Sequence, residues 1–265
     1  IHTDLGDHLA ATSEHEKASG VFSQLAIDHP DASFLAANLA SSYHHLSNTL
    51  SALGQTNEAI ELYNKAILIK EQLVKDQPDV PKYAGDLAAS HNNLAIALQN
   101  LGQSAEGIDE NNKAIAIREK LVQDHPGMPE YSMDLVTSYN NHGNVLRAIG
   151  QTVEAVELYN KAILIQEKLA KDHPDVPDYA IELARYYNNL GLALSEAGKH
   201  DQAKLVFERI VSMQPQTVEH WLDLARYYIY LENNDQAYAV LAKAAVAMPD
   251  SRELYLFCRA SPRLP

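Results

Sequence analysis

The sequence predicts an all-α protein, a right-handed α-solenoid of antiparallel helix pairs, and periodicity carries this prediction. Prolines recur every 48 residues, at Pro30, Pro78, Pro126 and Pro174. Glycines recur with the same spacing, at Gly6, Gly54, Gly102, Gly150 and Gly198. The stretch 54–73 is almost repeated at 150–169. Self-similarity at a fixed period of this length is typical of stacked repeats, each of which buries its apolar faces against its neighbours.

Each repeat reads as two helices. In the first, apolar side chains fall on one face at helical spacing, at Tyr83, Leu87, Leu94, Leu98 and Leu101. Gly102 then supplies the left-handed residue that ends a helix. The second helix carries its own stripe, at Ala59, Leu62, Ala66, Ile69 and Leu73. Thr56, Ser104 and Thr152 are candidate N-caps for these second helices.

The period divides the chain into unequal repeats. After Gly198 it shortens, because Pro215 and Pro249 are only 34 residues apart. We expect one continuous solenoid, in which a partial repeat turns at Gly6. Its predicted parts are a partial repeat at 1–30, long repeats at 31–78, 79–126 and 127–174, a transitional repeat at 175–217, a 34-residue repeat at 218–251, and a cap or tail at 252–265.

Composition excludes several classes of function. There are 35 acidic and 21 basic residues, which gives a formal net charge of −14. A phosphate-backbone binder needs a basic face, so we expect no nucleic acid and no anionic membrane as partner. No apolar run approaches the roughly 20 residues that span a bilayer. The chain has one cysteine, Cys258, which fits a reducing, cytoplasmic location. It begins at Ile1 without a methionine, which indicates a piece of a longer protein.

Residues 218–251 resemble the tetratricopeptide repeat family. The matching positions are Trp221, Leu224, Ala225, Tyr228, Ala237, Leu241, Ala244 and Pro249. The 48-residue repeats keep the same centre but add 14 residues, or seven per helix, which lengthens each helix by roughly 10 Å. They are similar to the long-repeat class of kinesin light chains and to bacterial arrays attached to signalling proteins. The resemblance implies a superhelix whose first helices line a concave groove.

Asparagine pairs in the middle of three first helices are the main candidate site. Asparagine is a poor helix former, so its recurrence there needs a reason. Family members use first-helix asparagines to hydrogen-bond a peptide backbone, which implies peptide-binding candidates at His44, Asn92, Asn93, Asn140, Asn141, Asn188 and Asn189. Asn144, Arg147 and Arg185 lie on similar faces and are candidates for reading side chains. The alternative is that the pairs bridge neighbouring helices as structural contacts, and the sequence leaves both open.

Other polar residues point to no chemistry. His29, His125 and His173 occupy one loop position, where Gln77 stands in the remaining copy, so they read as turn residues and not as metal ligands. Cys258 reads as a buried apolar residue. No phosphate loop, G-x-S-x-G or H-E-x-x-H motif is present. We therefore expect no metal, no cofactor and no enzyme.

The function predicted is a protein–protein interaction module that binds an extended peptide or a helix in the concave groove. The acidic balance favours a basic or neutral partner segment. Two alternatives stay open. One is a self-associating scaffold or spacer, which would be a homo-oligomer. The other is the regulatory tail of a larger signalling enzyme.

Overall fold

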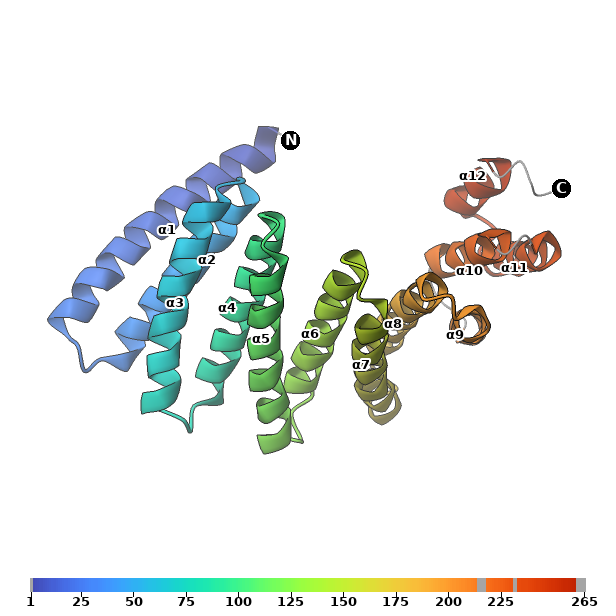
Figure 1. The fold of residues 1–265 in the computed structure, drawn as a ribbon. Helices are drawn as coiled ribbons and strands as arrows, with labels where there is room; N and C mark the ends of the chain where they lie inside the picture. Colours follow the sequence, from blue (N-terminus) through green and yellow to red (C-terminus); the bar gives the residue numbers. More distant parts are fainter. Residues whose placement is uncertain (1, 214–217, 231–232, 261–265) are drawn as a thin grey trace. The chain divides into compact units, whose positions relative to one another are not determined.

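The structure is a computed structural model that describes residues 2–213, 218–230 and 233–260. These residues contain twelve α-helices and no strand (Figure 1), so the predicted all-α class is confirmed. In chain order the helices are α1 (His2–Asp28), α2 (Ser33–Ala52), α3 (Thr56–Asp76), α4 (Pro81–Asn100), α5 (Ser104–Asp124), α6 (Pro129–Ala148), α7 (Thr152–Asp172), α8 (Pro177–Glu196), α9 (His200–Ser212), α10 (Val218–Tyr230), α11 (Asn234–Ala247) and α12 (Arg252–Ala260).

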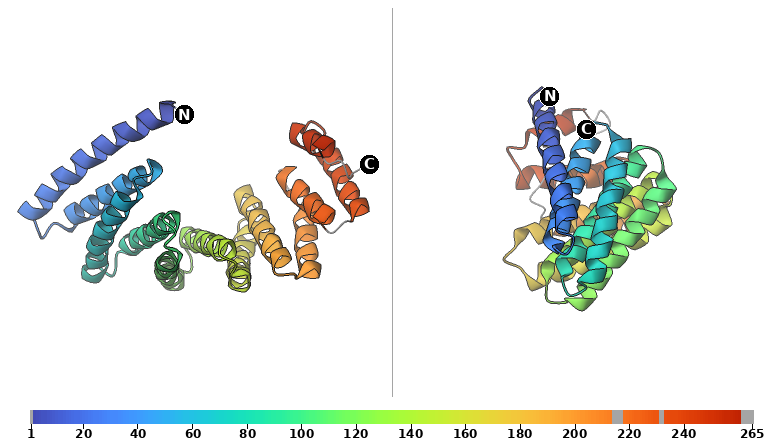
Figure 2. Two further views of the ribbon diagram at one scale, coloured as in Figure 1. Left: turned by 45° about the horizontal axis from the view of Figure 1, so that its top comes forward. Right: turned by 90° about the vertical axis from the view of Figure 1, so that its left-hand side faces the viewer.

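The chain forms two compact units, Ile1–Ser138 and Tyr139–Pro265. In the first unit α1 packs on α2, α2 on α3, α3 on α4, and α4 on α5 (Figure 2). In the second unit α7 packs on α8, α8 on α9, and α10 on α11. First helices of successive pairs also touch, namely α2 with α4, α8 with α10, and α10 with α12. Each unit is therefore a stack of helix pairs in which first helices of neighbouring pairs are in contact.

Helix lengths account for the two repeat periods. The long pair α4 and α5 has 20 and 21 residues, whereas the short pair α10 and α11 has 13 and 14. The prediction of seven extra residues in each helix is confirmed. The pair α8 and α9 combines a long first helix of 20 residues with a short second helix of 13.

Glycine turns separate the two helices of a pair. Gly54, Gly102, Gly150 and Gly198 all adopt positive φ, between 72° and 83°, as predicted. At the first of these turns Gln55 N–H donates to Leu50 O at 2.9 Å and Gly54 N–H donates to Ser51 O at 3.1 Å. This pair of bonds is a Schellman motif, and it uses every residue of the turn.

The predicted N-caps of the second helices are wrong by one residue. The N-cap residues are Gln55, Gln103 and Gln151, and none of them forms a side-chain capping bond. Thr56, Ser104 and Thr152 are already the first helical residues. The tight glycine turn leads directly into the next helix and leaves no place for a separate capping residue.

The predicted turn at Gly6 is also wrong. Helix α1 runs without interruption from His2 to Asp28, through both Gly6 and Gly20. A single glycine weakens a helix by only about 1 kcal/mol relative to alanine. It therefore does not end a helix unless the following chain folds back.

The core follows the repeat pattern. In the short pair Leu224, Ala237 and Ala244 are at most 2% exposed, and Trp221 and Leu241 are also buried. In the long pairs the corresponding centre includes Tyr159, which is fully buried. Aromatic rings lie directly on glycines here, since a Cβ atom at Gly143 would come within 2.7 Å of the Tyr159 ring.

The added turns of the long helices are joined by one recurring buried donor. Lys70 Nζ donates to Asp86 O at 3.0 Å and to Ser90 Oγ at 2.7 Å. Its counterpart 48 residues later, Arg118, donates to Asp134 O at 3.1 Å and also to the hydroxyl of Ser138. The next counterpart also donates to a carbonyl of the following first helix, but one turn earlier, from Gln166 Nε2 to Tyr179 O at 2.9 Å. Each donor ties the end of a second helix to the beginning of the next first helix.

Candidate functional site

In the first unit the asparagine positions form hydrogen bonds between α2 and α4. Asn93 Nδ2 donates to Asn48 Oδ1 at 3.0 Å and lies 3.3 Å from His44 Nε2. Asn48 Oδ1 also accepts from the hydroxyl of Tyr63. His44 Nδ1 is 3.0 Å from Ser90 Oγ, which also accepts from Lys70. One chain of bonds thus runs from Lys70 on α3 to Tyr63 on the same helix by way of both first helices.

Burial keeps this chain of bonds uncharged at its centre. Desolvation lowers the pKa of His44 to about 4, with a further lowering from the nearby Lys70 charge. His44 is therefore neutral at pH 7. Its Nε2 accepts from Asn93, so we assign the proton to Nδ1, which donates to Ser90 Oγ. Burial also raises the pKa of Tyr63 to about 12, which keeps its hydroxyl a donor.

In the second unit a similar bond joins α6 and α8. Asn189 Nδ2 donates to Asn140 Oδ1 at 2.7 Å, and Asn140 is only 2% exposed. On the same face Tyr159 OH donates to Asn144 Oδ1 at 2.8 Å. Asn188 Oδ1 is buried without a partner. In both units, then, the second residue of an asparagine pair bonds to the helix of the preceding repeat.

The remaining candidates do not join one cluster. Asn92 and Asn141 are half-buried on α4 and α6. Arg147 Nε lies 3.8 Å from Glu196 Oε2, while Arg147 Nη1 is buried without a partner. Arg185 bonds to Glu182 one turn earlier on α8 and lies over the Tyr186 ring, 5.0 Å from its centroid.

A hollow of about 360 Å³ lies beside the asparagine contacts of the first unit. Its lining carries no charged side chain and mixes three asparagines with apolar surface; it consists of Asn48, Ser51, Ala52, Tyr63, Asn93, Ile96 and Asn100. Only Asn93 among these residues was predicted from the sequence. Asn48 was within reach of prediction, because it stands 96 residues before the candidate Asn144 and so occupies the same repeat position.

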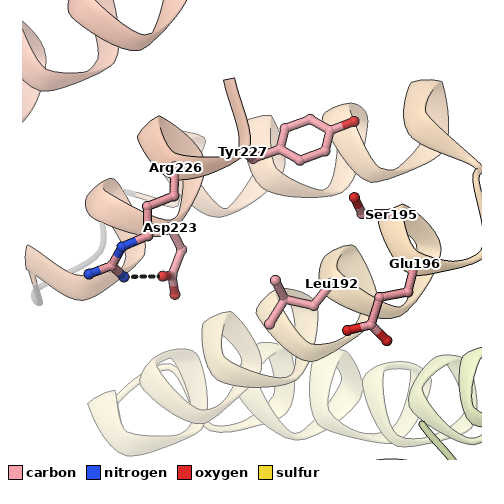
Figure 3. Close-up of a pocket in the computed structure, with 6 residues that line it drawn as sticks. All are labelled: Leu192, Ser195, Glu196, Asp223, Arg226 and Tyr227. Atoms are coloured by element: carbon pink, nitrogen blue, oxygen red, sulfur yellow. Dashed lines mark hydrogen bonds and ion pairs between the residues drawn. The ribbon is translucent and has the colours of Figure 1, made fainter. Parts of the chain in front are cut away.

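A second hollow, of about 320 Å³, lies between α8 and α10 in the second unit (Figure 3). It is mostly apolar, and its lining is Leu192, Ser195, Glu196, Asp223, Arg226 and Tyr227. None of these residues was predicted from the sequence. The only signal there is the place of the α8 residues, one and two turns beyond the pair Asn188-Asn189.

The histidines and the cysteine take structural or surface positions. His125 and His173 end α5 and α7, and their rings pack 5.5 Å and 5.8 Å from those of Tyr131 and Tyr179. Within the described residues no group of three metal-ligating side chains comes together. The predicted burial of Cys258 is wrong, because its side chain is exposed on α12, a helix that packs by other residues such as Leu254. No described helix is long and apolar enough to cross a bilayer.

Solved structures with the same fold include several repeat proteins. BtubC (BKLC) from P. vanneervenii is 18% identical, covers 91% of each chain and has a TM-score of 0.62. A kinesin-light-chain-like protein of nearly identical TPR-like repeats from Podosopora anserina is 24% identical over 82% of this chain and 98% of its own, with a TM-score of 0.60. YrrB, described as a TPR protein with an unusual peptide-binding site, is 18% identical over 91% of this chain and 99% of its own, with a TM-score of 0.51. At these identities the likeness shows the fold.

Sequence matches agree with the structural ones. No curated protein matches the chain as a relative. Three family models, all described as tetratricopeptide repeats, match residues 39–79 and 87–127, residues 134–216, and residues 194–258. Together they span most of the chain, and the chain belongs to the tetratricopeptide repeat family.

Proposed function

We propose that this chain is a non-catalytic protein–protein interaction module that holds an extended peptide against its first helices. The observation that carries the proposal is the uncharged, amide-lined hollow between α2 and α4. An asparagine side chain both donates and accepts hydrogen bonds, as a peptide bond does. A hollow lined by several amides and no charge suits the backbone of a partner more than one particular side chain.

The hollow is held in shape before any ligand enters. Asn48 Oδ1 is fixed by Asn93 and by the buried hydroxyl of Tyr63. Asn100, by contrast, is exposed at the rim and engages in no such contact between the two helices. Fixed walls reduce the side-chain ordering that binding requires, which favours affinity. YrrB, whose fold is similar, is described as having a peptide-binding site, and this supports the same type of ligand here.

The same proposal extends to the second unit. There Asn141, Asn144, Asn188 and Asn189 are proposed groove residues on α6 and α8, with Arg147 and Arg185 as candidates for contacts to side chains. Asn140 is proposed to position Asn189 through their 2.7 Å bond. Asn92 is the corresponding proposal on α4.

The test is peptide binding by the whole chain, measured by fluorescence anisotropy with a random peptide library that is then narrowed to single binders. Asn100→Arg places a large cation in the hollow without touching the buried bonds. We expect it to weaken binding at least tenfold. Asn64→Arg is the matched control, since Asn64 is exposed on α3 and does not line the hollow. Equal binding by the two variants would contradict the proposed site.

Self-association is the second candidate, and the exposed apolar side chains of α11 and α12 favour it. Val246 is 85% exposed, Tyr255 64% and Leu256 48%. Large apolar side chains that are exposed on two helices in contact are typical of a contact surface. Light scattering across a range of concentrations would show a dimer that Val246→Asp dissociates if this surface is used. A concentration-independent monomer would exclude it.

A further inference from the structure

The hollow between α8 and α10 has a rigid apolar floor. Tyr227 is buried, its hydroxyl donates to His200 O at 2.6 Å, and its ring packs 4.9 Å from that of Phe207. Leu192 lies on α8 and lines the hollow (Figure 3). A linear aliphatic chain fits such a floor, because it gains apolar contact without requiring the wall to move.

Carboxylates stand on both sides of this floor. Glu196 belongs to α8 and Asp223 to α10, and Figure 3 shows Leu192 between them. The Glu196 side chain is 50% exposed, and its closest cation, Arg147 Nε, is 3.8 Å away, so the Glu196 carboxylate remains accessible. Asp223 is 19% exposed and accepts from Arg226 at 2.7 Å through one oxygen.

The cation of Arg226 is directed away from the floor. Figure 3 shows its guanidinium on the far side of Asp223 from Leu192 and Glu196. There it lies over the Phe257 ring, 5.3 Å from the centroid, which holds it in that direction. Of the charged side chains that line the hollow, the two carboxylates therefore lie nearer to Leu192 than the Arg226 cation does (Figure 3).

We propose that this hollow binds a basic side chain, arginine or lysine, of the partner segment. The aliphatic stem lies on Leu192 and Tyr227, and the cation lies between Glu196 and Asp223. Long basic side chains use both parts in this way, burying the stem and keeping the charge at a polar rim. The chain's net charge of −14 attracts a basic segment over longer distances. The proposal rests on the peptide-binding function above and gives it a preferred side chain.

The direct test uses capped single amino acids, so that it does not depend on a peptide sequence. N-acetylated amides of arginine, lysine, norleucine and glutamate are titrated into the whole chain, and the Leu192 methyl signals are followed by NMR. We expect arginine and lysine to reach half-saturation at roughly fivefold lower concentration than norleucine, and this advantage to shrink at high salt. The proposal would be overturned if the norleucine compound bound with the same affinity as the arginine compound. It would also be overturned if the glutamate compound bound more tightly than either.

Variants give a second readout with opposite signs. Glu196→Gln and Asp223→Asn should each weaken arginine binding roughly three- to fivefold. Arg226→Gln removes the competing cation from Asp223 and should therefore strengthen arginine binding. If the hollow instead bound an acidic ligand, the same substitution would weaken binding. Glu182→Gln is the matched control, because Glu182 is on α8 but pairs with Arg185 outside the hollow. If Glu182→Gln weakened arginine binding as much as Glu196→Gln does, the result would contradict the proposed site.

These measurements separate the two proposals. If no peptide binds at the amide-lined hollow but arginine still shifts the Leu192 signals, the peptide function fails and the basic-side-chain site stands. If peptides bind and Asn100→Arg blocks them while arginine leaves Leu192 unmoved, the basic-side-chain proposal alone is refuted.

Discussion

The long helix pairs and the short pair of this chain are built on the same centre but are held together differently. In the short pair α10 and α11, the helix ends at Ala247, with Met248 as its C-cap. In the long pairs the helix continues at that position with a buried polar residue, Lys70, Arg118 or Gln166. Seven extra residues per helix therefore bring a buried hydrogen-bond donor into every interface between long repeats.

This difference shows how a longer repeat solves a packing problem. Lengthened helices need contacts along their added turns, where the family pattern provides no small or aromatic residues. The donor meets a backbone carbonyl of the next helix, so its partner does not depend on which side chain stands there. Lysine, arginine and glutamine can consequently all occupy the same place, and the chain itself supplies conservative substitutions for testing it.

The largest effect is expected when that donor is removed. Arg118 is 8% exposed, and Arg118→Ala leaves a cavity and the buried hydroxyl of Ser138 without its donor. We expect the free energy of unfolding to fall by about 2–4 kcal/mol, measured by urea unfolding monitored by circular dichroism. For Arg118→Gln, which introduces the residue found at Gln166, the free energy of unfolding should fall by less than half as much. An equal loss in both variants would mean that shape and charge matter more than the bond to the carbonyl.

A smaller effect is expected from the ring-on-glycine contact that distinguishes α8 and α9 from the short pair. A Cβ atom at Gly191 would lie 2.7 Å from Phe207 Cζ, and Phe207 is fully buried. Gly191→Ala should therefore destabilise by about 1–3 kcal/mol in thermal or urea unfolding.

The short pair shows which second substitution should offset the loss of stability in Gly191→Ala. It has Ala225 and Leu241 at the two corresponding positions, both buried. Phe207→Leu alone should destabilise by creating space, and the double variant with Gly191→Ala should be more stable than the sum of the single losses predicts. Strict additivity would contradict direct contact between the two residues.

A stabilising effect is expected at His142, where a long repeat carries histidine in place of the leucine that the short pair has at Leu224. His142 is 3% exposed, and both of its ring nitrogens are buried without a partner. His142→Leu should raise the free energy of unfolding by about 1–2 kcal/mol at pH 7.

The pH dependence checks the same variant. Burial lowers the folded-state pKa of His142 below 6.5, so the unfolded chain binds the proton more readily and stability falls as the pH drops below 6.5. His44, with its pKa near 4, contributes in the same direction between pH 6.5 and 4. His142→Leu should therefore lose stability less steeply between pH 7 and 5 than the parent chain does. Parallel curves would show that His142 does not titrate on unfolding.

The smallest effect is expected at Lys70, which tests whether the buried donor needs a charge. Burial lowers its pKa from 10.5 to about 8, while Asp86 raises it and Lys82 lowers it. The folded state thus disfavours the proton, and stability should rise with pH between 8 and 10.5. Lys70→Gln should be about 1 kcal/mol more stable at pH 7 and should lack this rise between pH 8 and 9.5. A less stable variant would show that the charge itself contributes.

Most of the fold was predictable because the repeats can be compared with one another, so a residue type that recurs at one repeat position indicates a structural requirement there. Gly102 and its three described counterparts recur at one position, and each adopts positive φ. Gly6 shares the spacing but lies inside a helix, since spacing alone does not reveal whether the chain around a glycine folds back. The N-cap prediction failed for a similar reason, because only the backbone bonds of the turn show where the second helix begins.

The candidate site was predictable only in part. The asparagine pairs stand out in the sequence, and Asn93 and Asn189 form the contacts between repeats that the structural alternative expects, while their role in binding stays a prediction. The residues of the α8–α10 hollow were missed, because Asp223 and Tyr227 belong to a different repeat from Leu192 and no sequence period brings them together.

By itself the sequence determined the paired helices from α2 onward, their two lengths and most of the small and aromatic residues of the core, since periodicity is a property of the order of residues. The tertiary structure decided which polar groups meet. Asn93 reaches Asn48 and Lys70 reaches the Asp86 carbonyl across 45 and 16 residues. Such bonds depend on how neighbouring helices are rotated and shifted relative to each other. Side-chain packing between the helices sets that arrangement, and the sequence of a single helix does not specify it.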